Sequence, residues 1–398
     1  MKLAYYPGCS LGGTAIEYHL STKKTAEILG IELEEIDDWN CCGATSAHNT
    51  DKLLSLALPA RNLAIAEQTG LDVLAPCAAC YNRFRATEHT VREDAVMKER
   101  IEKVINMPYE ATNKTISALE WLVEGIGLDK IKEKVTSPLA GMKVASYYGC
   151  LLVRPSAYTG FDDVENPQSM DDIMTALGAT AVDWAFKSEC CGAALATSRP
   201  DIGSKMVFNI LKNAQEAGAD CIVTACPLCM MNLDMRQASA EKAANEKIDM
   251  PIYYVTELLA IAAGVSPNEV GVNKHFVEAN KYLDAVAAER ARLELEAEKA
   301  KAEEAAKAEK GAKPELPPEE LEKKVAAMVK GFEKNPDKMA SRLIEDEERA
   351  AILAEIIVED AKKVTKLAEL MITDKEKAAK AADAYVTGEL RKREKANQ

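Results

Sequence analysis

Ten of the eleven cysteines in this sequence fall into two series of the same form. Each series has a single cysteine, then a Cys-Cys-Gly sequence, then a Cys-x-x-Cys sequence. The first comprises Cys9, Cys41, Cys42, Cys77 and Cys80, and the second comprises Cys150, Cys190, Cys191, Cys226 and Cys229. In both series, 35 positions separate the second vicinal cysteine from the start of Cys-x-x-Cys. A spacing that occurs twice indicates that each series acts as one unit.

The side chains of these cysteines suit soft metals. Thiolates select zinc, copper(I) or iron–sulfur clusters, and a structural zinc ion takes four ligands in a tetrahedron. Each series offers five thiols, two of them adjacent in sequence, which is a poor chelate for one ion. The compact run of cysteines typical of cubane ferredoxins does not occur in the sequence. We therefore predict an unusual iron–sulfur site in each half, with zinc binding and free thiols as the alternatives.

The cysteine count also bears on disulfides. A reducing compartment does not support a disulfide framework, and an odd count of eleven cannot pair completely within one chain. Cys221 lies outside both series, within an apolar segment. We predict that it is a buried, inert thiol.

The sequences around the two series repeat as well. Residues 2–9, which lead to the first cysteine, resemble residues 143–150. Each half alternates short apolar runs with helical sequence, which predicts small parallel sheets with flanking helices. Such sheets bind ligands beyond the carboxyl ends of their strands, where two of the three cysteine elements of each half fall. We therefore expect an α/β fold with two pseudo-symmetric half-domains, residues 1–140 and 141–280. The helical segments that we predict in them are 21–29, 53–68, 171–177 and 202–216.

The composition changes after the second half. Residues 281–398 hold 25 Lys and Arg and 27 Asp and Glu, with no Cys, Trp or His. Ala, Glu and Lys dominate residues 284–310, which predicts a solvated helix that ends at the glycine and prolines that follow. Beyond Pro318, apolar residues return at helical spacing. We expect a charged helical linker over 281–318 and a small α-helical extension over 319–398. The extension is either a solvated appendage or a docking module for a partner.

Charge and hydropathy exclude several classes of protein. The chain has 398 residues and a formal net charge of −14, which argues against a nucleic-acid partner bound through a basic footprint. The sequence has no apolar run long enough to span a membrane and no secretory signal at its start. We expect a cytoplasmic protein.

With ten cysteines in this order, the sequence resembles the CCG-domain family, and most closely the B subunit of heterodisulfide reductase. The resemblance covers residues 1 to about 260. It implies that each series holds one noncubane 4Fe-4S cluster through all five cysteines, and that the two half-domains are CCG domains. It also implies an oxidoreductase acting on sulfur groups, which reductively cleaves a disulfide placed between the clusters, either CoM-S-S-CoB or an analogous small disulfide. The methanogenic members carry His after the first cysteine of the second half; Leu151 at that position favours another disulfide.

Five further residues near the cysteines are candidates for roles in the reaction. His48, close to the first Cys-Cys-Gly, is a candidate proton donor to a leaving thiolate, with a surface or helix-start histidine as the alternative. Lys187, three residues before the second Cys-Cys-Gly, is a second catalytic candidate, with solvent exposure as the alternative. Arg154 would bind an anionic group of the substrate or form an ordinary ion pair. We expect Gly43 and Gly192 to shape the substrate site beside the vicinal cysteines.

The sequence shows no second route for electrons, since it has neither a ferredoxin run nor a dinucleotide fingerprint after a strand. The resemblance implies an iron–sulfur partner like the C subunit of heterodisulfide reductase, fed by a flavin protein like the A subunit. A hydrogenase or formate dehydrogenase module is a further possible partner. Two alternatives stay open: a CCG subunit of a thiol:fumarate or succinate–quinone oxidoreductase, and a non-catalytic electron relay or scaffold.

Overall fold

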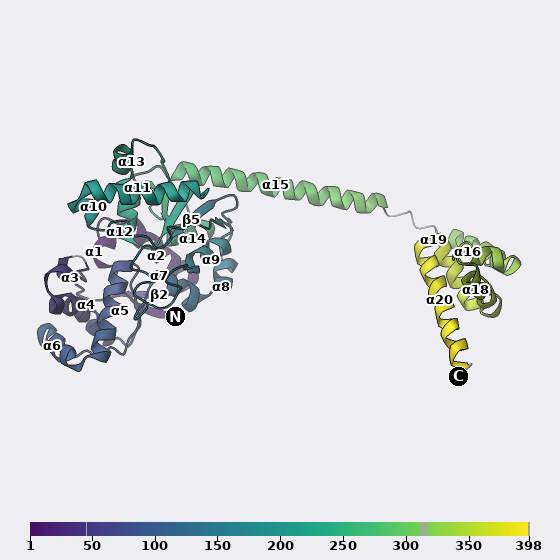
Figure 1. Ribbon diagram of the computed structural model, residues 1–398, viewed down its shortest axis with the longest axis horizontal. Helices are drawn as coiled ribbons and strands as arrows, with labels where there is room; N and C mark the ends of the chain where they lie inside the picture. Colours follow the sequence, from purple (N-terminus) through teal and green to yellow (C-terminus); the bar gives the residue numbers. More distant parts are fainter. Residues whose placement is uncertain (45, 312–316, 397–398) are drawn as a thin grey trace. The chain divides into compact units, whose positions relative to one another are not determined.

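The computed structural model describes residues 1–44, 46–311 and 317–396 (Figure 1). The chain divides into two compact units, Met1–Ala300 and Lys301–Gln398, and each is described by itself. Pro314, one of the prolines predicted to end the charged helix, lies outside the described residues.

Two four-stranded parallel sheets form the framework of the first unit, and they share one strand order, β2-β1-β3-β4 and β6-β5-β7-β8. The first sheet comprises β1 (Lys2–Tyr5), β2 (Glu32–Glu35), β3 (Val73–Leu74) and β4 (Thr115–Ile116). The second comprises β5 (Lys143–Tyr147), β6 (Thr180–Ala181), β7 (Cys221–Thr224) and β8 (Ile252–Tyr254). The predicted α/β fold, with two pseudo-symmetric halves and small parallel sheets, is confirmed.

The strand sequences follow from their places in the sheets. The central strands β1 and β5 are buried after an exposed first residue, the pattern expected where both faces of a parallel sheet are covered. The outer strand β2 carries acidic residues instead, as edge strands do. Lys2 of β1 pairs with two of them, Glu32 at 3.2 Å and Glu34 at 2.6 Å.

Helices connect the strands of both halves. In the first half they are α1 (Gly8–Leu11), α2 (Ile16–Leu29), α3 (Ser46–Thr50), α4 (Lys52–Glu67), α5 (Ala78–Glu93), α6 (Ala95–Ile105), α7 (Ala118–Glu120) and α8 (Leu128–Glu133). In the second half they are α9 (Ser169–Ala176), α10 (Leu195–Ser198), α11 (Pro200–Glu216), α12 (Pro227–Met230), α13 (Gln237–Ala244) and α14 (Val255–Ala262). The predicted helices correspond to α2, α4, α9 and α11, although α2 begins earlier than predicted.

Local sequence explains several helix ends. The Asp51 carboxylate accepts a hydrogen bond from the Leu54 amide at 2.8 Å and caps the start of α4. Pro200 occupies the first turn of α11, where its missing N–H costs no helical hydrogen bond. α2 ends at Gly30, whose φ of +69° is the left-handed conformation that glycine adopts most readily.

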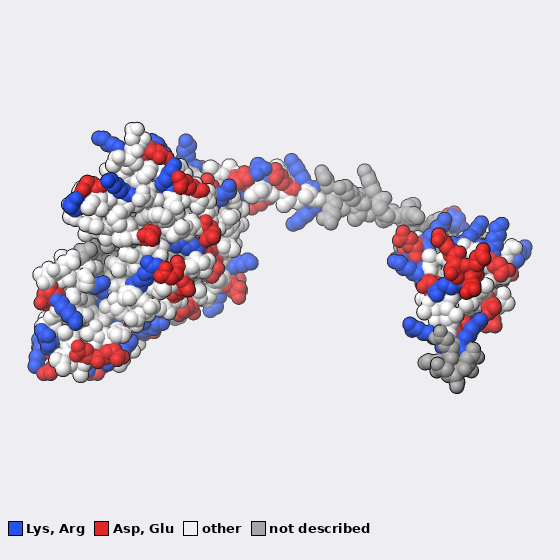
Figure 2. Space-filling view, in the orientation of Figure 1, with Lys and Arg blue, Asp and Glu red and all other residues white. Residues whose placement is uncertain are grey.

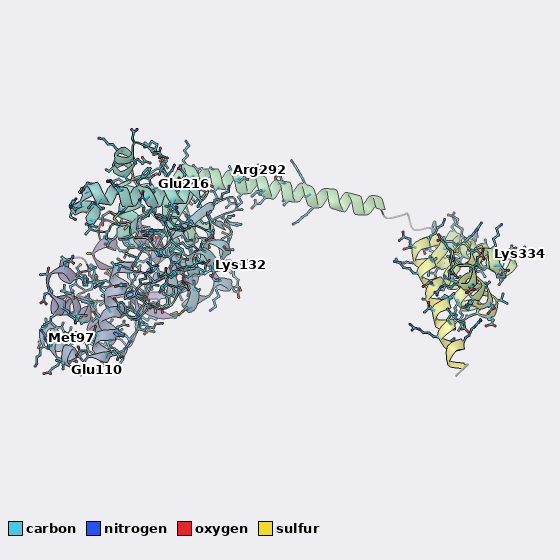
Figure 3. All side chains as sticks on the ribbon, viewed as in Figure 1. Met97, Glu110, Lys132, Glu216, Arg292 and Lys334 are labelled. Atoms are coloured by element: carbon cyan, nitrogen blue, oxygen red, sulfur yellow. The ribbon has the colours of Figure 1, made fainter. Side chains whose placement is uncertain are left out.

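The long charged helix α15 (Asn280–Gly311) begins within the core of the first unit. Leu283 and Val286 are both 6% exposed and belong to that core. Further along, Arg292 (Figure 3) pairs with acidic residues of its own helix, including Glu296 at 2.8 Å. The helix predicted over 284–310 is therefore present, and its first turns are anchored by apolar contacts.

The residues of the second unit that the structure describes form α-helices and short connections, as predicted. The unit comprises α16 (Pro318–Lys334), α17 (Pro336–Ala340), α18 (Glu347–Glu359), α19 (Ala361–Thr373) and α20 (Lys375–Ala396). Its core contains the fully buried side chains Phe332, Leu353, Leu367, Ala368 and Val386. On the faces drawn in Figure 2, Lys and Arg are interspersed with Asp and Glu on both units.

Candidate metal centre

The five cysteines of the first series gather beyond the carboxyl ends of the first sheet. Cys9 lies in α1 after β1, Cys41 and Cys42 lie in the loop after β2, and Cys77 and Cys80 lie where α5 begins after β3. The sulfur atoms of Cys9 and Cys41 are 3.6 Å apart, and those of Cys42 and Cys80 are 3.3 Å apart. The fold thus brings residues separated by up to 71 positions into one thiol set.

The second series repeats this arrangement beyond the second sheet. The sulfur atoms of Cys191 and Cys229 are 3.9 Å apart. A hydrogen bond from the Cys150 thiol lowers the pKa of Cys190 to about 6. Cys226 lies two residues after the end of β7 and directly precedes the first residue of α12, as Cys77 directly precedes α5. Each half therefore presents five thiols from equivalent elements.

Crowding of the thiols governs their ionisation. A hydrogen bond from Cys41 lowers the pKa of Cys42, and the same contact raises the pKa of Cys41. One thiolate is thus stabilised at the expense of its neighbour, and a bound metal would deprotonate all of its thiol ligands. Among the described residues, no group of three or more His, Cys, Asp or Glu side chains is arranged to hold a single metal ion. Five soft donors per half suit a larger group such as an iron–sulfur cluster.

The glycine of each Cys-Cys-Gly sequence is required by the backbone. Gly43 and Gly192 have φ values of +68° and +87°. Their amides donate to the first of the vicinal cysteines, Cys41 at 3.4 Å and Cys190 at 3.3 Å. A Cβ at Gly43 would lie 2.7 Å from the Cβ of Ala47. The structure thus places both glycines against the thiols, and their role in substrate binding stays a prediction.

A second pair of glycines leaves space beside the thiols. A Cβ on Gly8 would lie 3.4 Å from the sulfur of Cys80, and one on Gly149 would lie 3.0 Å from the sulfur of Cys229. Both glycines have positive φ and directly precede the first cysteine of their set. A side chain at either position would fill space beside the thiols.

Each thiol set also has a tyrosine that the sequence reasoning missed. The Tyr6 hydroxyl donates to the Asn40 carbonyl at 2.9 Å, and the Tyr147 hydroxyl donates to the Glu189 carbonyl at 2.7 Å. Burial and then the nearby cysteine sulfurs raise the pKa of both tyrosines. These two tyrosines occupy matching positions of the internal repeat, which is the signal that would have identified them. Their contacts also show that Asn40 and Glu189 are equivalent positions.

The two thiol sets meet at Cys77 and Cys226. The contact between these thiols raises the pKa of Cys77. Contacts with Cys229 and then Cys77 lower the pKa of Cys226. A group held by the first set would therefore lie next to a group held by the second.

A tyrosine of the first half spans this junction. The Tyr18 hydroxyl lies 3.1 Å from the carbonyl oxygen of Pro76 and 3.3 Å from that of Ala225, the residues directly before Cys77 and Cys226. The Tyr18 ring stacks on Tyr254 of the second half, with centroids 4.0 Å apart. Both rings are buried. Tyr18 was not among the predicted site residues, because its spacing to the cysteines carries no recognisable pattern.

His48 belongs to a polar network that connects the two halves. Its Nδ1 lies 2.9 Å from Arg83, which also donates to the Asn82 side chain at 3.1 Å. The Asn82 amide donates to the carbonyl oxygens of Leu151 (2.9 Å) and Arg154 (2.7 Å), in the loop after Cys150. Arg83 is a further residue that the sequence reasoning missed, although it lies one helical turn after the first Cys-x-x-Cys.

Arg154 is engaged within its own half. Its guanidinium donates to the Val164 carbonyl at 2.9 Å and to the Ser188 hydroxyl at 3.0 Å, and it pairs with Glu165 at 3.4 Å. These contacts hold the loop that follows Cys150. Its predicted role in binding a substrate anion stays a prediction.

Lys187 is buried, so the alternative of a solvent-exposed lysine does not hold. Its ammonium group pairs with Asp171 at 3.2 Å. Its carbonyl oxygen accepts hydrogen bonds from the amides of Tyr148 (2.8 Å) and Gly149 (3.1 Å). Lys187 thus holds the backbone that leads to Cys150 in place through hydrogen bonds. The catalytic role predicted for it stays a prediction.

Cys221 lies apart from both sets, in β7, and is fully buried. Its sulfur is 3.8 Å from the Lys143 carbonyl oxygen, and burial raises the pKa of the thiol. The prediction of a buried thiol outside the site is confirmed.

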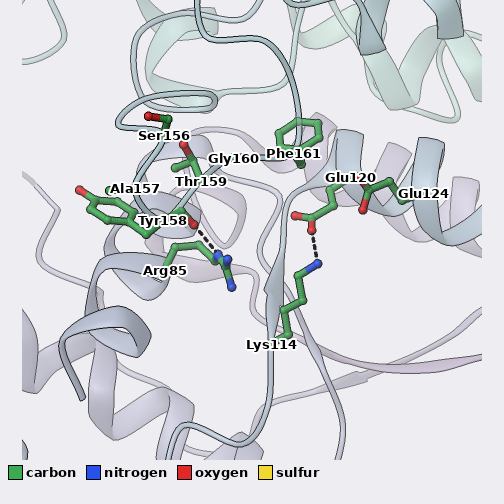
Figure 4. A pocket seen from close by; sticks show the side chains of 10 residues that line it. All are labelled: Arg85, Lys114, Glu120, Glu124, Ser156, Ala157, Tyr158, Thr159, Gly160 and Phe161. Atoms are coloured by element: carbon green, nitrogen blue, oxygen red, sulfur yellow. Dashed lines mark hydrogen bonds and ion pairs between the residues drawn. The ribbon is translucent and has the colours of Figure 1, made fainter. Parts of the chain in front are cut away.

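A separate pocket of about 210 Å³ lies where the loop 156–161 meets the first half (Figure 4). Both of its basic groups are already engaged: Lys114 contacts Glu120 at 2.5 Å, and Arg85 donates to the Tyr158 carbonyl at 2.8 Å. The ten series cysteines are not among the described residues that line it. We assign this pocket no role in the metal centre.

The duplicated sheets and thiol sets define a protein with two cysteine-rich CCG domains, and that family's model matches residues 3–85 and 144–234. The chain is 37% identical over 283 residues to the 8-methylmenaquinol:fumarate reductase membrane anchor subunit of Wolinella succinogenes, covering 70% of this chain and 98% of that one. It is 31% identical over 288 residues to the B subunit of the ferredoxin:CoB-CoM heterodisulfide reductase of Methanosarcina mazei, covering 71% of this chain and 96% of that one. The chain belongs to the CCG-domain family that includes the B subunit of heterodisulfide reductase, and the two relatives described above are named as reductase subunits.

The fold also occurs in a solved structure. The crystal structure of a hypothetical protein from Helicobacter pylori superposes with a TM-score of 0.58 at 14% identity, covering 70% of this chain and 52% of that one. At this identity the likeness shows a shared fold. None of the helices in the part of the chain that the structure describes is both long and apolar enough to cross a membrane.

Proposed function

We propose that the chain is the redox-active subunit of an oxidoreductase complex and holds two noncubane 4Fe-4S clusters, one in each thiol set. The observation that carries this proposal is the presence of two equivalent five-thiol sets, which meet at Cys77 and Cys226. Ligation by the five cysteines of each set would satisfy the crowded thiols, because metal binding removes their competing protons. The absence of side chains at Gly8 and Gly149 leaves space beside the thiols, which supports the binding of a larger group there.

The reaction that we propose is the reductive cleavage of a small disulfide. The clusters would supply one-electron chemistry, and the protein would supply access, orientation and protons. Access is available at the first set, where Cys9 and Cys41 are exposed. His48 is exposed as well and is the candidate proton donor near this set. Leu151, in the loop after Cys150, supports a disulfide other than CoM-S-S-CoB.

The second candidate is an electron-transferring subunit of a quinol:fumarate type of reductase. The observation that favours it is the 37% identity to the Wolinella succinogenes protein over nearly the whole length of that protein. In this case the two thiol sets would serve electron transfer alone, and no disulfide would react at them.

Either function requires partner subunits. The relatives are named as subunits of multi-component reductases, which supports a complex here as well. For the disulfide reaction we propose an iron–sulfur donor like the C subunit of heterodisulfide reductase and a flavin protein like its A subunit. A hydrogenase or formate dehydrogenase module would be the ultimate source of electrons.

The first test is the metal content of the full chain purified without oxygen. We expect about eight iron atoms per chain with matching acid-labile sulfide, and a new EPR signal when a thiol is added to the oxidised protein. Zinc with little sulfide in fully loaded protein would overturn the proposal.

The second test separates the two candidate functions. Reduced viologen should be oxidised by the chain when a small disulfide is supplied, and a Cys41→Ser variant should lose this turnover. If a menaquinol analogue reduces the clusters while disulfides leave them unchanged, the second candidate is correct.

A further inference from the structure

The two halves are duplicates, so equivalent positions around the two thiol sets can be compared directly. The residue three positions after Cys-x-x-Cys is Arg83 in the first half and Asn232 in the second. The Asn232 amide donates to the sulfur of Cys191 at 3.4 Å and to the Cys191 carbonyl at 3.2 Å. Arg83 lies between two elements of the first set, because it follows Cys80 by three residues in α5 and its guanidinium is 2.9 Å from His48 of α3, the helix after Cys-Cys-Gly. The same place thus holds a cation in one half and a neutral amide in the other.

The charge of Arg83 is available to the thiol set. Among the residues that the structure describes, its hydrogen-bond partners are the imidazole of His48 and the amide oxygen of Asn82, and neither is a carboxylate. The lysine near the second set differs in this respect, since Lys187 pairs with Asp171. A cation without an anionic partner stabilises negative charge on its neighbours more than a paired one does.

A second difference between the two halves also makes the surroundings of the first set more positive than those of the second. The residue directly before Cys-Cys-Gly is Asn40 in the first half and Glu189 in the second, and the matching tyrosine contacts show that these positions are equivalent. Glu189 directly precedes Cys190, so its carboxylate opposes negative charge on the second set. Glu189 is exposed, so solvent screens part of this effect. The first set therefore has the more positive surroundings at both positions.

Solvent access differs as well. Cys9 and Cys41 of the first set are exposed, whereas the equivalent Cys150 and Cys190 are partly buried. Net charge, hydrogen bonds to sulfur and solvent exposure are the variables that set the reduction potential of an iron–sulfur group. Charge and exposure both favour the reduced, more negative state in the first set. The hydrogen bond from Asn232 to Cys191 acts the other way, but a neutral donor is weaker than a charged one.

We propose that the cluster held by the first set has the higher reduction potential. The positive charge of Arg83, which acts as a positioning residue, raises this potential. This inference rests on the proposed two-cluster function. An electron that passed from a group held by the second set to one held by the first would oxidise the former and reduce the latter, and no bond would form or break. Electrons from a low-potential iron–sulfur donor would thus collect at the exposed set, beside Cys9 and Cys41.

The test is an EPR-monitored redox titration of the full chain with dithionite and redox mediators. We expect two separate midpoint potentials in the wild-type protein. In Arg83→Gln the higher midpoint should fall, so that at the wild-type midpoint the ratio of oxidised to reduced cluster rises about tenfold, which is 59 mV for one electron. The lower midpoint should stay in place. Arg83→Lys, which keeps the charge, should stay close to the wild type.

Two further variants control the experiment. Arg92→Gln removes a cation from the last turn of the same helix, α5, and should move neither midpoint. Glu189→Gln alters an exposed side chain and should raise the lower midpoint, which keeps the proposal testable if Arg83→Gln assembles poorly. Coincident midpoints in the wild type, or equal shifts of both midpoints in Arg83→Gln, would overturn the inference. A chain without iron and sulfide would instead refute the proposed function itself.

Discussion

The hydroxyl of Tyr18, in the first half, lies 3.3 Å from the carbonyl oxygen of Ala225, in the second half. The same hydroxyl lies 3.1 Å from the carbonyl oxygen of Pro76. Both carbonyls belong to the residue directly before a Cys-x-x-Cys sequence, so one buried hydroxyl links the two places where the thiol sets meet. The geometry between the sets therefore depends on this side chain as well as on the cysteines.

Replacing Tyr18 with Phe should destabilise the first unit. Two buried carbonyls would lose their shared donor, which costs about 1–3 kcal/mol of unfolding free energy. Urea denaturation of the full chain under reducing conditions measures this loss. Tyr5→Phe is the matched control, because the Tyr5 hydroxyl contacts His19 within the first half (3.1 Å) and does not bridge the halves. If both variants lose the same stability, the junction has no special role.

Loss of one ligand should affect one set. In Cys41→Ser or Cys190→Ser we expect the iron and sulfide content to fall to about half of the wild-type value, because under the proposed function each series would hold its own cluster. Cys221→Ala provides the control, since this thiol is buried in β7 outside both sets. It should keep the full metal content and lose only about 1 kcal/mol of stability. Retention of all iron in both serine variants would contradict the assignment of ligands.

The Cys-Cys-Gly turn should not tolerate a side chain. Gly43→Ala forces a φ of +68° on alanine and places its Cβ 2.7 Å from Ala47. Gly30→Ala is the matched control, because Gly30 has a φ of +69° with nothing within 4 Å of the added Cβ. The control should lose about 1–2 kcal/mol of unfolding free energy from the backbone alone. Gly43→Ala should lose about 1–3 kcal/mol more from the overlap, together with metal from the first set. Equal losses would argue against crowding at the turn.

Stability should fall as the pH rises above neutrality, because of a buried ion pair. Burial lowers the pKa of His275, but the carboxylates of Glu257 (2.9 Å away), Asp234 and Glu17 together raise it more, and the net pKa lies above the ordinary value. The pair therefore contributes its full stability below the unfolded-state pKa of about 6.5. That contribution is lost as the pH rises through the folded-state pKa.

Urea denaturation between about pH 6 and 9 tests this dependence. Glu17 and Asp234 also lie near His275, and burial raises their pKa values, so they change stability in the same direction at lower pH. A His275→Gln variant isolates the histidine and should show a flatter profile across this range. A profile that matches the wild type would mean that the pair does not control the dependence.

Removal of the charged tail should destabilise the first unit only if the truncation also removes Leu283 and Val286. A chain that ends at Ala300 keeps the buried side chains Leu283 and Val286 and should retain the stability and metal content of the first unit. A chain that ends at Tyr282 loses both side chains. We expect it to lose about 1.5–3 kcal/mol for each. Comparison of the two truncations by thermal unfolding checks this, and equal stability would mean that α15 contributes nothing to the core.

The donor set, the duplication and the class of fold could all be predicted from the order of the residues. The cysteines could be grouped because the same spacing occurs twice, and the sheets could be inferred because apolar runs alternate with helical sequence. These are local or repeating features, so they can be recognised without knowledge of packing. The anchored start of α15 was less visible, because Leu283 and Val286 alone do not distinguish a buried turn from a solvated one.

Which other residues reach the thiols depends on the packing of the whole fold. Tyr18 and Ala225 are 207 positions apart, and Arg83 and His48 are 35 apart, so no local period relates them. Lys187 is paired in the interior because α9 brings Asp171 to it. The hydrophobic effect that packs such elements together is non-directional, and the identity of a distant partner is therefore set by the complete tertiary structure rather than by either segment.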